Sequence, residues 1–101
     1  MKALNIDINK DNLIKIAQIN DMVFLGLFGS FARGEATAKS DVDLLVRFSK
    51  RKSLLDLVRI ERELSDTLGR NVDLLTEASI SPYLLERIKA ETVVLYNEQE
   101  R

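Results

Sequence analysis

Cysteine and histidine are both absent from this chain, and only one proline and four glycines occur among its 101 residues. Without cysteine the chain forms neither disulfides nor thiolate metal sites, and without histidine it lacks the usual imidazole base and metal ligand. Any metal chemistry must therefore depend on carboxylates. Long hydrophobic runs are lacking too, because the longest, residues 22–28, is far below the ~20 residues that span a bilayer.

A strong charge of either sign is also lacking, since 15 basic residues face 16 acidic ones and the net charge is -1. No overall field therefore draws the protein to nucleic acid or to an anionic membrane, and phosphate must be bound locally. We expect no direct nucleic-acid binding and no membrane association. Asp7 stands where a signal peptide would continue its apolar region, which predicts a soluble, cytoplasmic protein.

The composition suits one compact domain, because 46% of the residues are hydrophobic and no repeat or Pro/Gly-rich linker divides them. We expect a single domain over residues 1–101. Apolar spacing predicts a helix over residues 11–20, capped by Asn9 or Asp11. A strand that is apolar on both faces is predicted over residues 22–28.

A second strand is predicted over residues 42–48. One of its faces carries Val42, Leu44 and Val46, and the other carries Asp43, Leu45 and Arg47. Ser53 then caps a long helix that ends at Gly69, with Asp56 as the capping-box partner. The buried stripe of that helix is expected to comprise Leu54, Leu57, Ile60, Leu64 and Leu68.

The last third of the chain predicts a strand over residues 71–75, a helix opened by Ser81 and Pro82 that runs to about Ala90, and a short edge strand over residues 92–96. The inward face of that helix is expected to comprise Leu84, Leu85 and Ile88. This order predicts an α/β (α+β) two-layer domain. Periodicity does not fix which strands run parallel.

Gly29 and Ser30 form a turn between the first strand and a helix of one or two turns. A glycine at a strand end lets backbone N–H groups approach a ligand, and a helix start adds N–H donors and a positive dipole end, which favour phosphate. Ser30 adds a hydroxyl donor. Alone, the pair predicts little, since Gly-Ser is a common turn dipeptide.

Asp41 and Asp43 lie two residues apart at the start of the second strand, so their side chains point to the same face. Two carboxylates so placed can bracket a pair of Mg²⁺ ions about 3.5–4 Å apart. The alternative is a turn residue followed by a solvent-facing acid. This alternative is disfavoured, because two like charges side by side on an apolar strand repel each other unless a cation lies between them.

Asp73 lies in the apolar strand at residues 71–75 and joins the other two acids if that strand lies beside the Asp43 strand. Metal coordination removes the cost of burying an unpaired acid. A surface acid on an edge strand is the alternative. Ten residues, 31–40, separate Ser30 from Asp41, and this joint spacing carries more weight than either half alone.

With the segment GSFARGEATAKSDVDLLV, the chain resembles the DNA polymerase β-like nucleotidyltransferase superfamily, in particular its minimal nucleotidyltransferase (MNT) branch. The segments NVDLL and SPYLLERIKAETVVLY are similar to the third-carboxylate strand and the C-terminal end of that branch. The resemblance implies a polymerase β-like fold with a small mixed sheet. It also implies Mg²⁺-dependent transfer of AMP from ATP, or of another nucleotide, to a tyrosine hydroxyl of a HEPN-type toxin, with this chain as the antitoxin.

Position by position, the resemblance implies that Gly29 and Ser30 contact the β- and γ-phosphates and that Asp41 and Asp43 ligate both of two Mg²⁺ ions. It implies that Asp73 binds the second metal and helps to deprotonate the attacking hydroxyl. The metals lower the pKa of that hydroxyl, so no histidine is required.

Arg33 and Arg47 are further candidates to steady the triphosphate charge, although surface arginines are more often simply solvated. Four aromatic residues are expected to pack in or against the core: Phe28, Phe31, Tyr83 and Tyr96.

Two other functions stay open. One is a binding module that neutralises its toxin by occlusion, with or without transfer, and the intact set of three acids argues against a decayed site. The other is a transferase acting on a small molecule such as an aminoglycoside, which usually needs additional substrate-binding structure.

Overall fold

A computed structural model describes residues 10–98 as alternating helices and strands. In order these are α1 (Lys10–Ile19), β1 (Met22–Phe28), α2 (Ser30–Arg33), β2 (Val42–Phe48), α3 (Leu54–Leu68), β3 (Val72–Thr76), η1 (Glu77–Ser79), α4 (Pro82–Glu91) and β4 (Val93–Asn97). Each predicted element is present, shifted by one residue at most, and the 3₁₀ turn η1 is an addition. Asp11 lies in the first turn of α1, whereas Asp7 and Asn9 lie outside the described residues.

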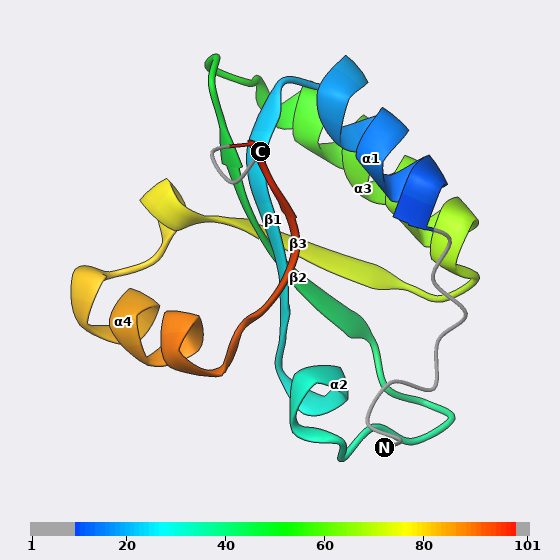
Figure 1. The fold of residues 1–101 in the computed structure, drawn as a ribbon, viewed down its shortest axis with the longest axis vertical. Coiled ribbons are helices and arrows are strands. Elements are labelled where there is room, and N and C mark those ends of the chain that lie inside the picture. The colour runs from blue at the N-terminus through cyan, green and yellow to red at the C-terminus, as the bar shows by residue number, and fades with distance from the viewer. Residues whose placement is uncertain (1–9, 99–101) are drawn as a thin grey trace.

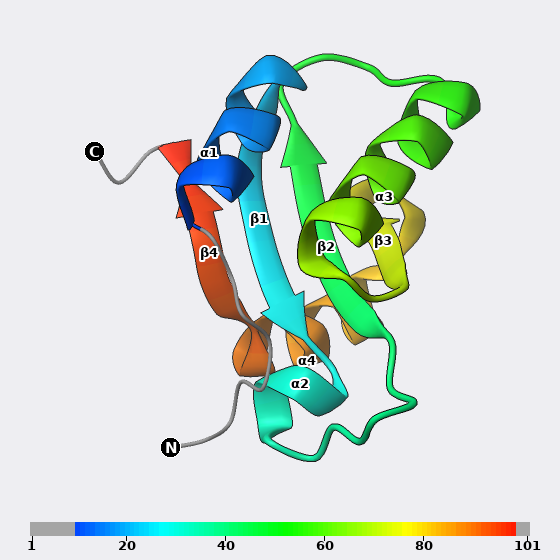
Figure 2. The same cartoon turned by 90° about the vertical axis from the view of Figure 1, so that its right-hand side faces the viewer.

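The strands form one mixed sheet in the order β3-β2-β1-β4. β1 pairs antiparallel with both β2 and β4, and β2 pairs parallel with β3. Helix α3 makes the crossover that a parallel pair requires. Figures 1 and 2 show α1 and α3 on one face of the sheet and α4 on the other. The predicted α/β fold with a small mixed sheet is confirmed, and α4 adds partial cover to the second face.

The core lies between the sheet and the α1/α3 pair. Its fully buried side chains include Leu13, Leu25, Leu27, Val42, Leu44, Val46, Ile60 and Leu64, and Phe31 of α2 joins them. These residues come from the apolar faces that alternation and helical spacing define. β1 and β2 are therefore the most deeply buried strands of the sheet.

Helix α3 begins and ends as its sequence predicts. Ser53 and Asp56 exchange two hydrogen bonds of 3.1 Å in a capping box, and Gly69 closes the helix at a φ of 70°. The predicted stripe is buried at its last three positions, but Leu54 is 77% exposed. The prediction for Leu54 is wrong, because the buried residues of this helix begin only at Ile60.

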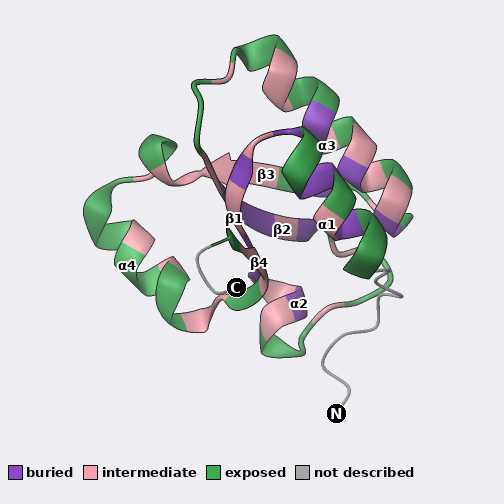
Figure 3. Ribbon diagram, turned by 45° about the horizontal axis from the view of Figure 1, so that its top comes forward, coloured by how far each residue is buried: buried purple, intermediate pink, exposed green. Residues whose placement is uncertain are grey.

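Helix α4 is packed much more thinly. Ser81 caps it and Pro82 occupies its first turn as predicted, yet none of its residues is buried (Figure 3). Leu84 is 48% exposed and Tyr83 76% exposed, so the predicted packing of both is wrong. The helix covers only part of its face of the sheet, which leaves these side chains without a surface opposite them. No helix within residues 10–98 is both long and apolar enough to cross a membrane.

Candidate active site

The turn after β1 is shaped around Gly29. Its φ of 77° and ψ of -152° suit glycine and strain any other residue. A Cβ at this position would also collide with the carboxylate of Asp43. The contact follows from the ladder, because Phe28 pairs with Asp43 across β1 and β2. The Gly29 turn, predicted to bind phosphate, therefore lies directly against the Asp43 carboxylate.

Two of the three predicted acids face each other across adjacent strands. Asp43 of β2 and Asp73 of β3 are register partners in the parallel pair, while Asp41 lies just before β2. Asp43 is half-buried, and Asp41 and Asp73 are exposed. Burial raises the pKa of Asp43 above its usual value, and the nearby charges of Asp73 and Asp41 raise it further. The three acids thus form one negative cluster at an edge of the sheet.

Arg33, at the end of α2, lies close enough to this cluster to lower the pKa of Asp43 in part. Its guanidinium is shared by two carboxylates: Nε donates to Glu35 at 3.0 Å, and Nη1 donates to Glu91 at 3.2 Å. Glu91 also accepts a hydrogen bond from the backbone N–H of Gly29 at 2.9 Å. The last residue of α4 therefore sits on the turn that the sequence assigns to phosphate.

Sequence reasoning missed Glu91, which lies 62 positions from the residue whose N–H it accepts. One signal was available. A carboxylate at the last position of a helix opposes the negative end of the helix dipole, where cations are favoured. An acid in that place indicates a compensating contact elsewhere in the fold.

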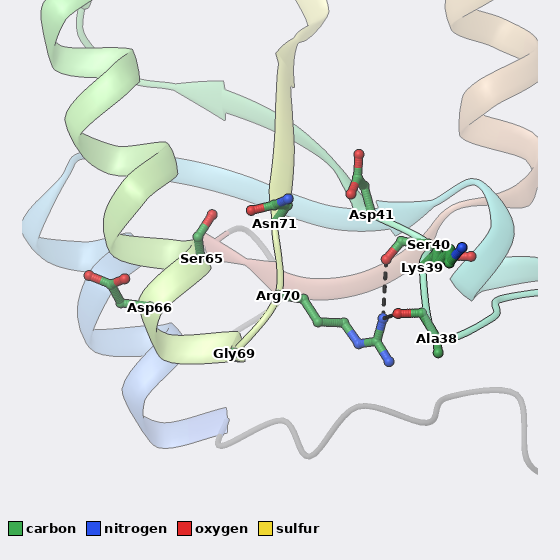
Figure 4. Close-up of a pocket in the computed structure, with 9 residues that line it drawn as sticks. All are labelled: Ala38, Lys39, Ser40, Asp41, Ser65, Asp66, Gly69, Arg70 and Asn71. Atoms are coloured by element: carbon green, nitrogen blue, oxygen red, sulfur yellow. Dashed lines mark hydrogen bonds between the residues drawn. The ribbon is translucent and has the colours of Figure 1, made fainter.

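Asp41 also lines a pocket of about 820 Å³ that lies between the loop before β2 and the end of α3 (Figure 4). The guanidinium of Arg70 donates there to the carbonyl oxygens of Ala38 and Ser40, at 3.3 and 3.2 Å. It also lies 5.0 Å from the ring centroid of Phe31. Arg70, which sequence reasoning also missed, thus ties the loop that carries Asp41 to α2.

Residues 11–101 match the family model described as "Polymerase beta, Nucleotidyltransferase". The chain belongs to this nucleotidyltransferase family. It is 46% identical over 90 residues to a predicted protein adenylyltransferase of Methanocaldococcus jannaschii, covering 89% of this chain and 97% of that protein. It is 41% identical over 69 residues to protein adenylyltransferase MntA of Thermococcus cleftensis, covering 68% of this chain and 70% of that one.

Solved structures agree on the fold. A predicted minimal nucleotidyltransferase matches with a TM-score of 0.74 at 36% identity, over 83% of this chain and 86% of that chain. A chain of a toxin–antitoxin crystallised with AMP-PNP matches at 0.78 and 24% identity, over 92% and 77%. A chain from the complex of tri-AMPylated Shewanella oneidensis HEPN toxin with MNT antitoxin matches at 0.68 and 22%, over 90% and 71%. The predicted family and enzyme class are confirmed.

For a nucleotidyltransferase, this arrangement offers backbone and guanidinium donors for phosphate beside carboxylate oxygens that suit Mg²⁺. Asp41, Asp43 and Asp73 fit a divalent cation by donor chemistry, since a cation would relieve the repulsion that raises the pKa of Asp43. Within residues 10–98, no three acidic side chains are already placed as ligands of one metal ion. Binding would have to draw the acids together.

Arg47 takes no part in this site of the nucleotidyltransferase. It lies near the far end of β2, where its Nη1 donates to Glu77 at 3.1 Å and its guanidinium lies over the ring of Phe24. The prediction for Arg47 is therefore wrong, because a strand residue four positions beyond Asp43 lies roughly 13 Å farther along the strand. It secures η1 instead.

Proposed function

We propose that this chain transfers AMP from ATP to a tyrosine hydroxyl of a HEPN-type toxin and silences the toxin by that modification. Its likeness to protein adenylyltransferases, at 46% identity over 90 residues, supports the reaction class. The observation that carries the proposal is the contact of the Gly29 turn with Asp43, which itself faces Asp73. That contact supports phosphate binding at the Gly29 turn beside the paired acids Asp43 and Asp73.

In the proposed reaction, the Gly29 N–H, the Ser30 hydroxyl and the Arg33 guanidinium hold the β- and γ-phosphates of ATP. Asp41 and Asp43 would hold two Mg²⁺ ions, with Asp73 on the second. When bound, Mg²⁺ polarises the α-phosphate, neutralises the leaving pyrophosphate and lowers the pKa of the attacking hydroxyl.

The bond changes balance without a further reactant. The acceptor oxygen forms a bond to the α-phosphorus, the bond from that phosphorus to the α–β bridging oxygen breaks, and pyrophosphate leaves. Asp73 takes the hydroxyl proton. Because Asp73 is exposed on the edge strand β3, a tyrosine from another protein can reach it without any change in the core.

The test is to incubate the protein with ATP, Mg²⁺ and a HEPN-type protein, and then to measure the intact mass of the HEPN protein and its RNase activity. We expect an added AMP on tyrosine together with loss of RNase activity. Asp41→Asn and Asp43→Asn should abolish both, whereas Asp66→Asn, which removes an exposed acid of α3, should change neither. Full neutralisation by the Asp41 and Asp43 variants without any adduct would contradict the proposal and favour occlusion.

A further inference from the structure

Glu91 occupies the groups that the proposed function gives to the donor phosphates. Its Oε2 accepts from the Gly29 N–H at 2.9 Å and from Arg33 Nη1 at 3.2 Å, and its Oε1 lies 3.3 Å from the same nitrogen. The turn therefore already holds an anion, supplied by the chain itself. Gly29 is buried, so its N–H has little access to any other acceptor while Glu91 stays in place.

A carboxylate and a phosphate cannot share these donors. The Gly29 N–H points to one acceptor, and two anions within contact of each other repel strongly where solvent is limited. Glu91 also adds to the negative charge around Asp43, in the direction that opposes a further anion. Binding of a triphosphate at this turn thus requires that Glu91 leave.

We propose that Glu91 is a positioning residue that stands in for a donor phosphate. In the nucleotide-free protein it keeps the Gly29 turn and Arg33 in place, and the β- and γ-phosphates of ATP must displace it. This inference rests on the proposed function. Glu91 acts through Gly29 and Arg33 and takes no part in the bond changes themselves.

The thin packing of α4 keeps the free-energy cost of displacing Glu91 low. None of the helix's residues is buried, and Glu91, its last residue, has a side chain that is 31% exposed. Elements with few buried contacts shift at low free-energy cost. Val93, two residues farther on, pairs with Leu27 of β1 and holds the backbone there, so the Glu91 carboxylate leaves by rotating toward water, without disturbing the core beneath β1 and β2.

The test is to titrate ATP with Mg²⁺, and separately AMP, into the wild type and Glu91→Gln in a calorimeter. Glutamine keeps a neutral acceptor for the Gly29 N–H but removes the competing charge. We expect the Kd for ATP to fall about 10-fold and to fall less at high salt, since the effect is electrostatic. The Kd for AMP, which lacks the β- and γ-phosphates, should stay unchanged. Glu86→Gln removes an exposed acid from the same helix and should leave both constants unchanged.

Glu91→Asp provides a second variant, because it keeps the charge but shortens the reach to Gly29, and we expect a smaller gain in ATP affinity. Equal or weaker ATP binding by Glu91→Gln, or an equal gain for AMP, would overturn the inference and leave the proposed function standing. If neither the wild type nor Glu91→Gln binds ATP, the proposed function fails and the inference fails with it. A thermal melt of each variant shows that it is folded.

Discussion

The two faces of the sheet differ sharply in packing, and the candidate site lies where they meet. On the α1/α3 face, Leu25, Leu27 and Leu44 are fully buried, whereas on the other face α4 buries none of its residues. Asp43 belongs to the central strand β2, Gly29 directly follows the central strand β1, and Glu91 belongs to α4. The difference indicates that the tightly packed face fixes the backbones of β1 and β2 next to the site, while Glu91, on the thinly packed face, controls access to the Gly29 turn.

The largest effect is expected from Asp43, the acid that the central strand β2 carries. Asp43→Asn should lower the rate of AMP transfer by about 100-fold to 1,000-fold or more, because it removes a metal ligand at the centre of the acid cluster. Initial rates at saturating ATP measure this. A loss of less than about 10-fold would mean that Asp43 is not a ligand.

Truncating a leucine to alanine should lower the free energy of unfolding much more on the α1/α3 face of the sheet than on α4. Leu44→Ala, at a fully buried position, should cost about 2–5 kcal/mol of unfolding free energy. Leu84→Ala, on α4 at 48% exposure, should cost less than about 0.5 kcal/mol. Urea denaturation measures both values. Similar costs for the two variants would contradict the described packing.

Gly29→Ala and Gly69→Ala form a matched pair, since both positions have a positive φ, 77° and 70°. Each should lose about 1–2 kcal/mol from backbone strain. A Cβ at Gly29 would also meet the Asp43 carboxylate, while nothing lies within 4 Å of one at Gly69. AMP transfer should therefore fail in Gly29→Ala and persist in Gly69→Ala, as rates on folded protein would show. Equal activity of the two variants would contradict the contact.

The smallest effect concerns the charge on Asp43. Because its pKa is raised in the folded protein, its ionised form lowers the free energy of unfolding, and this loss develops as the pH rises above the usual carboxyl range. Asp43→Asn should thus raise the Tm of the metal-free protein at neutral pH by about 1–4 °C, a small gain because Asp43 is partly solvated. The gain should vanish at pH values below that range, and a lower Tm at neutral pH would contradict the account.

The fold was predictable wherever local chemistry decides it. Helix α3 is set by the capping box of Ser53 and Asp56 and by Gly69, all visible in the sequence. The pairing of Asp43 with Asp73 was a conditional prediction, because periodicity assigns a residue to a face but does not choose the neighbouring strand. Similarly, a helical apolar pattern on α4 does not reveal how much of the sheet that helix covers. The predicted burial of Leu84 is therefore wrong.

Only the part of the site whose residues lie close together in the chain was predictable. Gly29, Asp41 and Asp43 lie close together in the chain, and their spacing identifies the family. Glu91 and Arg70 reach the site through contacts that span 62 and 30 positions, and only the folded sheet brings them there. Such partners leave at most an anomaly in the sequence, as the acid at the end of α4 does.

The central claim is tested most directly by following which phosphate reaches the acceptor. A HEPN-type protein is incubated with this chain, Mg²⁺ and ATP that carries a radiolabel in either the α- or the γ-phosphate. We predict that the α-label becomes attached to a tyrosine, that the γ-label leaves with pyrophosphate, and that Asp43→Asn transfers neither. Transfer of the γ-label, or a silenced toxin that carries no label, would contradict the account.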